Sequence, residues 1–337
     1  MKEILHRLCA DKGISGSEDE MRGIIRELAG DIAGVRSLPL GSIAAEMGDP
    51  DAKKHIMLDA HIDRIGLIVT YIDDEGFIKA EPVGGIDLRT LAGNVVTVYG
   101  KEELTGVICT VPPHLSRDNK ALTREAVWID TALPVRQVRE LVQQGDSVLV
   151  CSAYTELLGN KISCSALDNR AGCAVLIRCM QLLRDKELPC RLSVVFSSQE
   201  ETHESGAETA AFILRPDEAV VIDAGYGRQQ GVPKEKSGKL GSGSIISIAP
   251  SLSRGVTDKL IALARELNMA SAYEVCGGKT GTNADKISVS AGGVRTGCIS
   301  FPDKNMHTQT EMVSLDDLEK LSQLLALYVL EGGASHA

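Results

Sequence analysis

Apolar residues recur at helical spacing over residues 1–32, which predicts two short helices separated by the Gly13–Ser17 stretch. Ser17 and Glu20 have the spacing of a capping box at the start of the second helix. A different pattern follows at His55–Ala60, which is mostly apolar without helical spacing. Runs of this kind are typical of strands that helices bury on both faces. The first part of the chain therefore predicts a sheet covered by helices.

The middle of the chain changes character between about Leu67 and Val150. Short β-rich runs recur there, separated by acidic and glycine-containing turns, and one short helix is predicted at Pro134–Gln143. This pattern predicts a small antiparallel barrel or sandwich. The predicted strands are Leu67–Tyr71, Phe77–Pro82, Asn94–Tyr99, Gly106–Thr110 and Ser147–Val150.

From Ser163 onward, strands and helices alternate again. The chain therefore predicts an α/β domain with helices on both faces of a mixed sheet, formed by residues 1–66 and 156–337 and interrupted by a β-rich domain at residues 67–155. The predicted helices after Ser163 are Arg170–Arg184, Ser205–Leu214, Thr257–Asn268 and Asp316–Leu330, and the predicted strands are Leu192–Ser197, Glu218–Ile222, Ser244–Ile248, Ile287–Ser290 and Gly297–Ser300.

The composition of the chain limits the classes of function and partner that fit it. A chain of 337 residues suits one large and one smaller domain. Its net charge of −10, without a segregated basic patch, argues against nucleic acid as a partner. No run approaches the roughly 20 apolar residues that span a bilayer, and the mixed charges of the N-terminus do not form a signal peptide. Nine scattered cysteines without a CxxC pair fit reduced thiols, so we expect a cytoplasmic protein without a membrane partner.

Acidic and histidine side chains follow the predicted buried strands, where ligands collect in open α/β sheets. His61 and Asp63 come after the first of these strands and point to the same side of an extended backbone. Asp63 can therefore orient the imidazole of a metal-binding His61, although a structural histidine is the alternative. Asp168 precedes a long helix, where it is either an ordinary N-cap or an ionised carboxylate that bridges two cations.

Three more positions complete this pattern. Glu200 and Glu201 point in opposite directions, so one can bind a metal while the other acts as a general base; solvated surface acids are the alternative. Asp223 ends an apolar strand as a turn-former or as a ligand, and His307 alone would be an ordinary surface histidine. The set His61, Asp168, Glu201, Asp223 and His307 together predicts two divalent ions per chain, because such pairs, about 3.5–4 Å apart, are a known device for hydrolysis.

Nitrogen and oxygen ligands without a thiolate suit Zn²⁺, Co²⁺ or Mn²⁺. The motifs that carry these ligands follow one another as His-x-Asp, ALDNRAG, a Glu-Glu pair, a strand ending in Asp and a late Met-His. This order resembles the M42 family of metallopeptidases, which includes glutamyl aminopeptidases and proteins named endoglucanase M, and the resemblance covers nearly the whole chain. It implies that His61, Asp168 and Asp223 hold one ion, and that Asp168, Glu201 and His307 hold the other.

The resemblance also implies an activity and an assembly. The chain would release N-terminal residues from short peptides through a metal-activated water, with Glu200 as the general base and Asp63 orienting His61. It would contain a cis peptide between Asp168 and Asn169. Residues 67–155 would form a dimerisation domain, with a homo-oligomer as the result; the family favours a dodecamer over a dimer.

The sequence departs from the family pattern at three places, none of which removes a ligand. Arg64 stands where the family often has Glu, Asn283 replaces the Asp of a Gly-Thr-Asp-Ala pattern, and Phe301–Asn305 lacks an expected Arg. These departures bear on substrate preference and assembly.

Three other functions are alternatives to an aminopeptidase. The first is a related two-metal amidohydrolase that acts on acylated amino acids or dipeptides; N-blocked substrates separate the two, since an aminopeptidase needs a free amine. A glycosidase would need two carboxylates and no metals. A non-catalytic scaffold would not keep the complete set of ligands.

Overall fold

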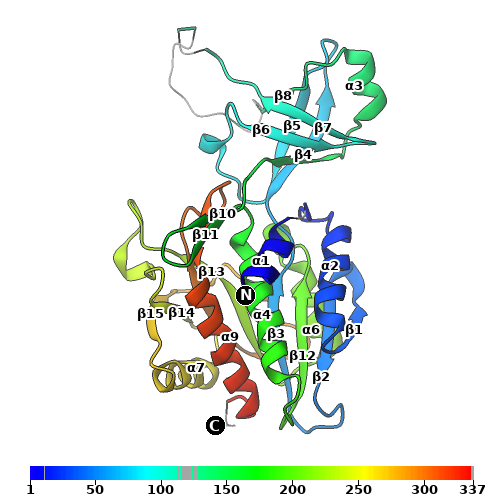
Figure 1. Ribbon diagram of the computed structural model, residues 1–337. Helices are drawn as coiled ribbons and strands as arrows, with labels where there is room; N and C mark the ends of the chain where they lie inside the picture. Colours follow the sequence, from blue (N-terminus) through cyan, green and yellow to red (C-terminus); the bar gives the residue numbers. More distant parts are fainter. Residues whose placement is uncertain (11, 113, 116–122, 124–126, 335–337) are drawn as a thin grey trace.

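The computed structural model describes residues 1–10, 12–112, 114–115, 123 and 127–334. Residues 116–122 and 124–126 of the predicted β-rich domain lie outside this description. Figure 1 shows two parts, a larger layered α/β part that contains both termini and a smaller β part above it. Among the described residues, no helix is both long and apolar enough to cross a bilayer.

A mixed sheet forms the centre of the larger part, as the sequence predicts, and it has eight strands. Its four inner strands pair in parallel, whereas the pairs β1–β2, β2–β12 and β14–β16 are antiparallel. The carboxyl ends of the parallel strands therefore meet at one edge. The order is β1 (Gly34–Ser37), β2 (Ile43–Met47), β12 (Arg191–Ser197), β3 (His55–His61), β13 (Glu218–Tyr226), β16 (Arg295–Asp303), β14 (Gly243–Ile248) and β15 (Ala270–Val275).

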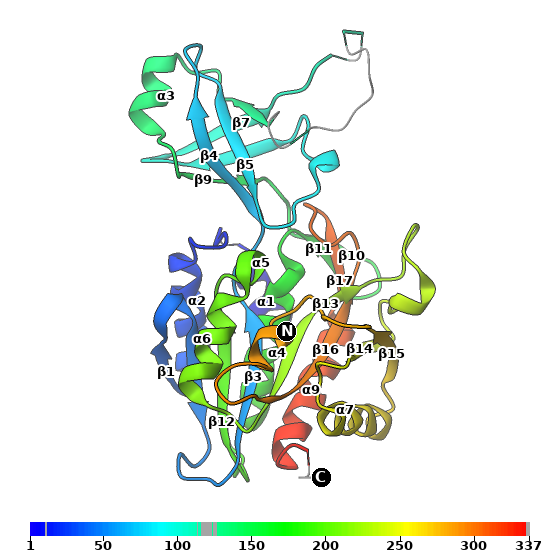
Figure 2. The same ribbon diagram turned by 180° about the vertical axis from the view of Figure 1, so that it is seen from behind.

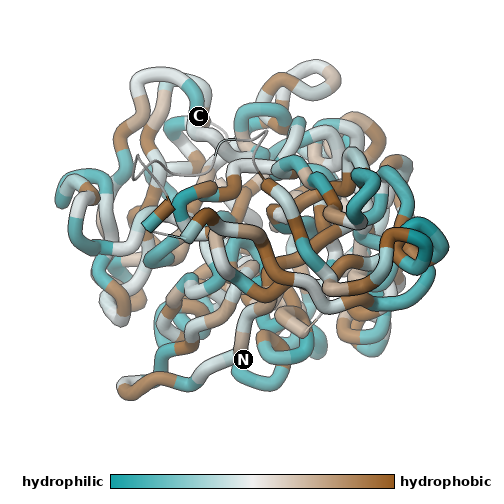
Figure 3. The backbone as a smooth tube through the Cα atoms, turned by 90° about the horizontal axis from the view of Figure 1, so that it is seen from above, coloured by the Kyte–Doolittle hydropathy of each residue, from teal (hydrophilic) through white to brown (hydrophobic). Residues whose placement is uncertain are grey.

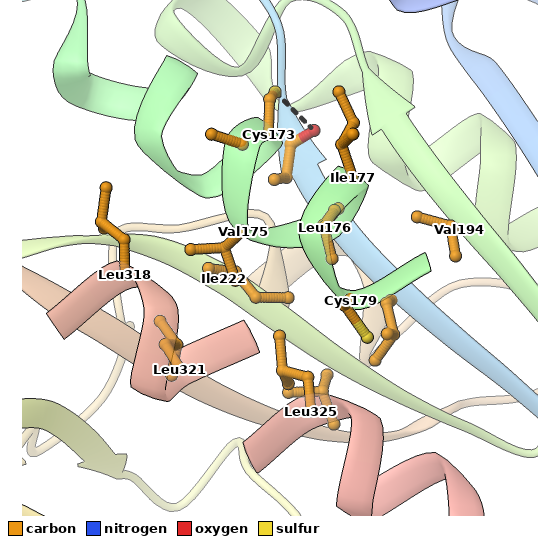
Figure 4. Packing of buried hydrophobic residues seen from close by; sticks show 14 of the residues in the cluster. Cys173, Val175, Leu176, Ile177, Cys179, Val194, Ile222, Leu318, Leu321 and Leu325 are labelled. Carbon is orange, nitrogen blue, oxygen red and sulfur yellow. Dashed lines mark hydrogen bonds between the residues drawn. The ribbon is translucent and has the colours of Figure 1, made fainter. Parts of the chain in front are cut away.

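Helices cover both faces of this sheet (Figures 1 and 2). In the larger core, Val175 of α4 packs with Ile222 of β13 and Leu321 of α9 (Figure 4). Burying such side chains contributes about 1.5–3 kcal/mol each. One face carries α1 (Lys2–Cys9), α2 (Asp19–Gly30), α4 (Leu167–Leu183), α7 (Arg254–Glu266) and α9 (Leu315–Leu330), and the other carries α6 (Ser205–Leu214) and α8 (Ala284–Ile287).

The β-rich segment is a closed barrel with its own apolar core, which includes Leu67, Val96 and Val148. It follows β3 directly and stands over the carboxyl edge of the large sheet (Figure 1). Seen from above, hydrophilic segments gather at the periphery of the molecule (Figure 3). The barrel order is β4 (Gly66–Ile72), β5 (Ile78–Val83), β8 (Trp128–Asp130), β7 (Glu103–Ile108), β6 (Val95–Tyr99) and β9 (Ser147–Val150), with α3 (Val135–Leu141) beside it.

A three-stranded sheet lies beside the large one in the order β10 (Thr155–Leu157), β11 (Lys161–Cys164) and β17 (Glu311–Ser314). The remaining short elements are α5 (Glu200–His203) and the 3₁₀ turns η1 (Pro39–Gly41), η2 (Leu88–Thr90) and η4 (Lys234–Lys236).

Two local predictions were wrong. The predicted strand Ile287–Ser290 is instead the end of α8 and the turn after it. The predicted capping box of Ser17 and Glu20 does not form, because α2 begins after Glu18 without a side-chain cap. The Glu18 carboxylate accepts hydrogen bonds from the backbone of Gly16 (2.8 Å) and Gln199 (3.2 Å) instead.

Candidate metal centre

The predicted ligands converge because their strands run in parallel to one edge of the sheet. β3 pairs in parallel with both β12 and β13, so the residues at their carboxyl ends become neighbours. His61 is the last residue of β3, Glu200 and Glu201 begin α5 directly after β12, and Asp223 lies in β13. Asp168 lies at the start of α4, and His307 follows β16.

Four side chains surround the imidazole of His61, and three of them face Nε2. This nitrogen lies 3.2 Å from Asp168 Oδ1, 3.5 Å from Asp223 Oδ1 and 3.8 Å from Glu200 Oε2. One donor atom each of His61, Glu200 and Asp223 lies within 4.8 Å of the others. We call His61 and Asp223 the His61 half of the centre, and Glu200 lies beside it.

The second group of side chains is the His307 half, formed by His307 and Glu201. His307 Nε2 lies 3.2 Å from Asp168 Oδ2 and 3.6 Å from Glu201 Oε2. The two oxygens of Asp168 therefore face different histidines. The Asp168–Asn169 peptide is cis, as predicted.

Asp63 connects the fourth side of His61 to the turn that carries the two glutamates. Its Oδ1 lies 3.4 Å from His61 Nδ1. Its two oxygens also accept hydrogen bonds from the backbone of Glu200 (3.0 Å) and Glu201 (3.1 Å). One buried carboxylate thus contacts the imidazole and the backbone of both glutamates.

The donor atoms fit divalent cations. Asp168 Oδ1 and Glu201 Oε1 are buried and have no hydrogen-bond partner, although buried carboxylate oxygens are normally bonded. The contact of Asp168 Oδ1 with His61 is close but is not a hydrogen bond. Two groups of three donors, made of imidazole nitrogen and carboxylate oxygen, are a suitable ligand set for Zn²⁺, Co²⁺ or Mn²⁺.

Electrostatics also favour bound cations here. Burial raises the pKa of Glu200 well above its usual value, with repulsion from Asp223 and Glu201 adding to it. Burial and the charge of Asp168 raise the pKa of Glu201 to about 8. Burial lowers the pKa of His61, yet the neighbouring carboxylates more than offset this and raise it well above its usual value. The raised pKa of His61 indicates that the surrounding carboxylates carry more negative charge than the protein itself neutralises.

The barrel contributes backbone to the His307 half. The Gly85 carbonyl, in the loop after β5, lies 3.0 Å from His307 Nδ1. A Cβ on Gly85 would come within 2.9 Å of the same nitrogen, so the close approach requires a glycine. The orientation of His307 is thereby linked to the position of the barrel.

Glu311 is a residue of this site that the sequence analysis missed. It is 1% exposed, and its two oxygens accept hydrogen bonds from the backbone of Asp168 and of His307, both at 3.0 Å. It therefore fixes the backbone of two residues of the centre at once. The available signal was an acid four residues after His307, at the start of a strand, but that spacing alone does not distinguish it from a surface acid.

Two of the residues that depart from the family pattern, Asn283 and Arg64, form hydrogen bonds with buried or nearby side chains. Asn283 donates hydrogen bonds to Asp59 Oδ2 (2.8 Å) and Ser197 Oγ (2.9 Å), in the buried layer beneath His61. Arg64 is buried and donates a hydrogen bond to Ser165 Oγ (2.7 Å), three residues before Asp168. Both substitutions thus support the elements around the centre without entering it.

A cavity of about 370 Å³ opens beside the ligands. It connects the His307 half to β13, β15 and β16, and its volume lies within the range of small-molecule sites. Its lining residues are Gly85, Asp168, Glu200, Glu201, Thr202, Glu204, Asp223, Ala224, Gly225, Tyr226, Glu274, Thr280, Gly281, Thr282, Ser300, Met306 and His307.

Known proteins share this architecture along their whole length. The lysyl aminopeptidase of Pyrococcus furiosus is 26% identical, over 96% of this chain and 94% of the relative. An aminopeptidase structure from Desulfurococcus kamchatkensis superposes with a TM-score of 0.91 at 28% identity, covering 98% of this chain and 94% of that one.

A Pyrococcus horikoshii TET1 peptidase, which can assemble into a tetrahedron or a large octahedral shell, superposes with a TM-score of 0.87 at 32% identity, covering 98% and 99% of the two chains. Residues 41–324 match the M42 glutamyl aminopeptidase family. Peptidases of this family are metal-dependent, in agreement with the two ligand groups. The chain therefore belongs to the M42 peptidase family and is a hydrolase of the aminopeptidase class.

Proposed function

We propose that the chain is a two-metal aminopeptidase that removes N-terminal residues from short peptides. His61, Asp168 and Asp223 would hold one divalent ion, and Asp168, Glu201 and His307 the other. The observation that supports this most directly is the placement of Asp168, whose two oxygens each lie 3.2 Å from the Nε2 atom of a different histidine. A pair of divalent ions supplies electrophilic activation of the peptide carbonyl and lowers the pKa of water.

Glu200 is the proposed general base. Its carboxylate lies beside the His61 half and lines the cavity, where a substrate carbonyl and a water can meet. It takes a proton from the attacking water and delivers it to the nitrogen of the leaving amine. Asp63 acts through other groups: it orients His61 by its contact with Nδ1 and fixes Glu200 by accepting a hydrogen bond from its backbone.

A substrate pair tests this function. An aminoacyl p-nitroanilide and its N-acetylated form should be compared in the presence of Zn²⁺, Co²⁺ or Mn²⁺. An aminopeptidase releases p-nitroaniline only from the form with the free amine, whereas an amidohydrolase of acylated amino acids would break the acetyl–nitrogen bond of the blocked form and release acetate. Cleavage of the blocked substrate alone would reject the proposal.

The barrel is the proposed dimerisation domain of a homo-oligomer, with a dodecamer expected. Four large apolar side chains on its strands support pairing, since they are 37–48% exposed: Ile68, Tyr71, Val95 and Val107. Multi-angle light scattering should therefore give a mass of several chains. A monomer at micromolar concentration would reject the assembly and leave the proposed chemistry untouched.

A further inference from the structure

The cavity beside the metal centre has a second end without any predicted ligand. Glu204, just after α5, and Glu274, in the edge strand β15, supply its carboxylates. Two threonines also line the cavity. We call Glu204, Glu274, Thr280 and Thr282 the acidic end of the cavity.

The acidic end presents mainly hydrogen-bond acceptors. Glu204 Oε2 is buried without a hydrogen-bond partner. Across the described part of the chain, neither Glu204 nor Glu274 forms an ion pair within 4.0 Å, and the cavity lining contains no Lys or Arg. Lys286 and Lys279 lower the pKa of Glu204, and Lys236 lowers that of Glu274, but all three lysines lie outside the lining, and Lys286 forms an ion pair with Glu208 at 3.4 Å.

Two divalent ions at the proposed centre would leave this charge unbalanced. Their positive charge would be matched by Asp168, Glu201 and Asp223, and by Glu200 beside them. Among the described residues, neither Glu204 nor Glu274 is hydrogen-bonded or ion-paired to a predicted ligand, although the charge of Asp223 helps to raise the pKa of Glu204. Burial raises the pKa of both carboxyls, because it partly removes their charged forms from water.

We propose that the acidic end binds the side chain of the substrate's N-terminal residue and selects lysine or arginine. This rests on the proposed aminopeptidase function, since the peptide bond must lie at the metal centre for its first side chain to enter this end. An ammonium group has three donors and no acceptor, so carboxylates and threonine hydroxyls can satisfy it together. A glutamyl side chain would instead meet two carboxylates of its own sign.

The first experiment compares aminoacyl p-nitroanilides of Lys, Arg, Leu, Ala and Glu on the metal-loaded full-length protein. We expect kcat/KM for Lys and Arg to exceed that for Leu by about tenfold or more, since charge-assisted hydrogen bonds are worth that ratio. The Glu substrate should be the poorest. Free L-lysine should also inhibit more strongly than L-norleucine, which has the same carbon chain without the ammonium group.

The second experiment uses Glu204→Gln, Glu274→Gln and the double variant. Each single change should lower kcat/KM for the Lys substrate several-fold, mostly through KM, and leave the Leu substrate within about twofold. The double variant should abolish the preference for Lys. Glu266→Gln is the matched control, because Glu266 is an exposed acid at the end of α7 outside the cavity.

The outcomes separate this inference from the function on which it rests. Efficient cleavage of Leu or Glu substrates with poor cleavage of Lys would overturn the proposed selectivity and leave the aminopeptidase intact. Equal losses for Lys and Leu in Glu204→Gln or Glu274→Gln would mean that the carboxylate binds the α-ammonium group, which would overturn its role here. No cleavage of any aminoacyl substrate in the metal-loaded protein would reject the proposed function itself.

Discussion

The two halves of the candidate metal centre are built by different means. In the His61 half, the histidine ends a strand that is paired on both sides, and its side chain is 1% exposed. In the His307 half, the histidine lies in the loop between β16 and β17, and its side chain is 30% exposed. The sheet thus positions one half, whereas Glu311 and the barrel loop at Gly85 position the other. We expect the first half to hold its ion more tightly.

The largest effect should come from Glu200, which lies beside the His61 half but is proposed to act on protons. Glu200→Gln should lower kcat about 10²–10⁴-fold, the usual contribution of a general base. The variant should still bind both ions, because the predicted ligands remain. Steady-state kinetics and metal analysis on the same sample measure the two quantities. Glu201→Gln is the comparison, since it should weaken the ion of the His307 half; a Glu200→Gln enzyme with normal turnover would show that the roles are wrong.

Replacing the two histidines separately tests whether the two halves of the centre bind their ions with different affinity. His61→Ala should weaken the tighter ion and His307→Ala the looser one, each by more than the about 10–100-fold of an outer-shell mutation, because a direct ligand is lost. Calorimetric titration of each metal-free variant resolves which step disappears. Loss of the same step in both variants would show that the centre does not divide as described.

Glu311 should matter mainly for the His307 half. Glu311→Gln keeps one acceptor for the backbone of Asp168 or His307 but cannot serve both equally, so we expect the looser ion to bind about 10–100-fold more weakly. Glu311→Ala should be worse than Glu311→Gln. Circular dichroism checks that both variants fold. If the conservative variant were no better than alanine, the hydrogen bonds would not be what positions the ligands.

The smallest effect should come from the barrel loop. The added methyl group of Gly85→Ala would meet His307 Nδ1 at 2.9 Å and displace the ring, which should weaken the looser ion by less than about tenfold. The tighter ion should be unaffected. Gly23→Ala in α2 serves as the control, since nothing lies within 4 Å of its added Cβ. Equal changes in the two ions would contradict the link between barrel and His307.

The same division explains what the sequence could predict. His61 and Asp223 lie at or near the ends of apolar strands, so parallel pairing alone predicts that they meet. His307 and Glu311 lie on either side of an irregular loop, and His307 became a candidate only together with the other four predicted ligands, since alone it would be an ordinary surface histidine. The spacing of Glu311 did not identify it, because its partners are backbone amides: that of Asp168, which is distant along the chain, and that of His307, four residues before it.

The prediction of secondary structure was wrong where one short sequence pattern is compatible with both a strand and a helix. Ile287 and Val289 alternate as in a strand, yet Ile287 ends a helix and Val289 is 69% exposed in the turn after it. Short apolar runs do not separate the two by periodicity. The edge strands β1 and β15 were not predicted, because their residues are mostly exposed or half-buried and lack the apolar signal of the inner strands.

Two divalent ions are proposed to bind in two unequal halves, and hydrolysis is proposed to depend on both. The most direct test is to remove metal from the full-length protein with EDTA and to titrate Co²⁺ or Zn²⁺ back, while heat and the cleavage of an aminoacyl p-nitroanilide are followed together. We expect no hydrolysis without metal, two binding steps of different affinity per chain, and full activity once the second step is complete. Full activity in a metal-free sample, or saturation with a single ion, would contradict the account.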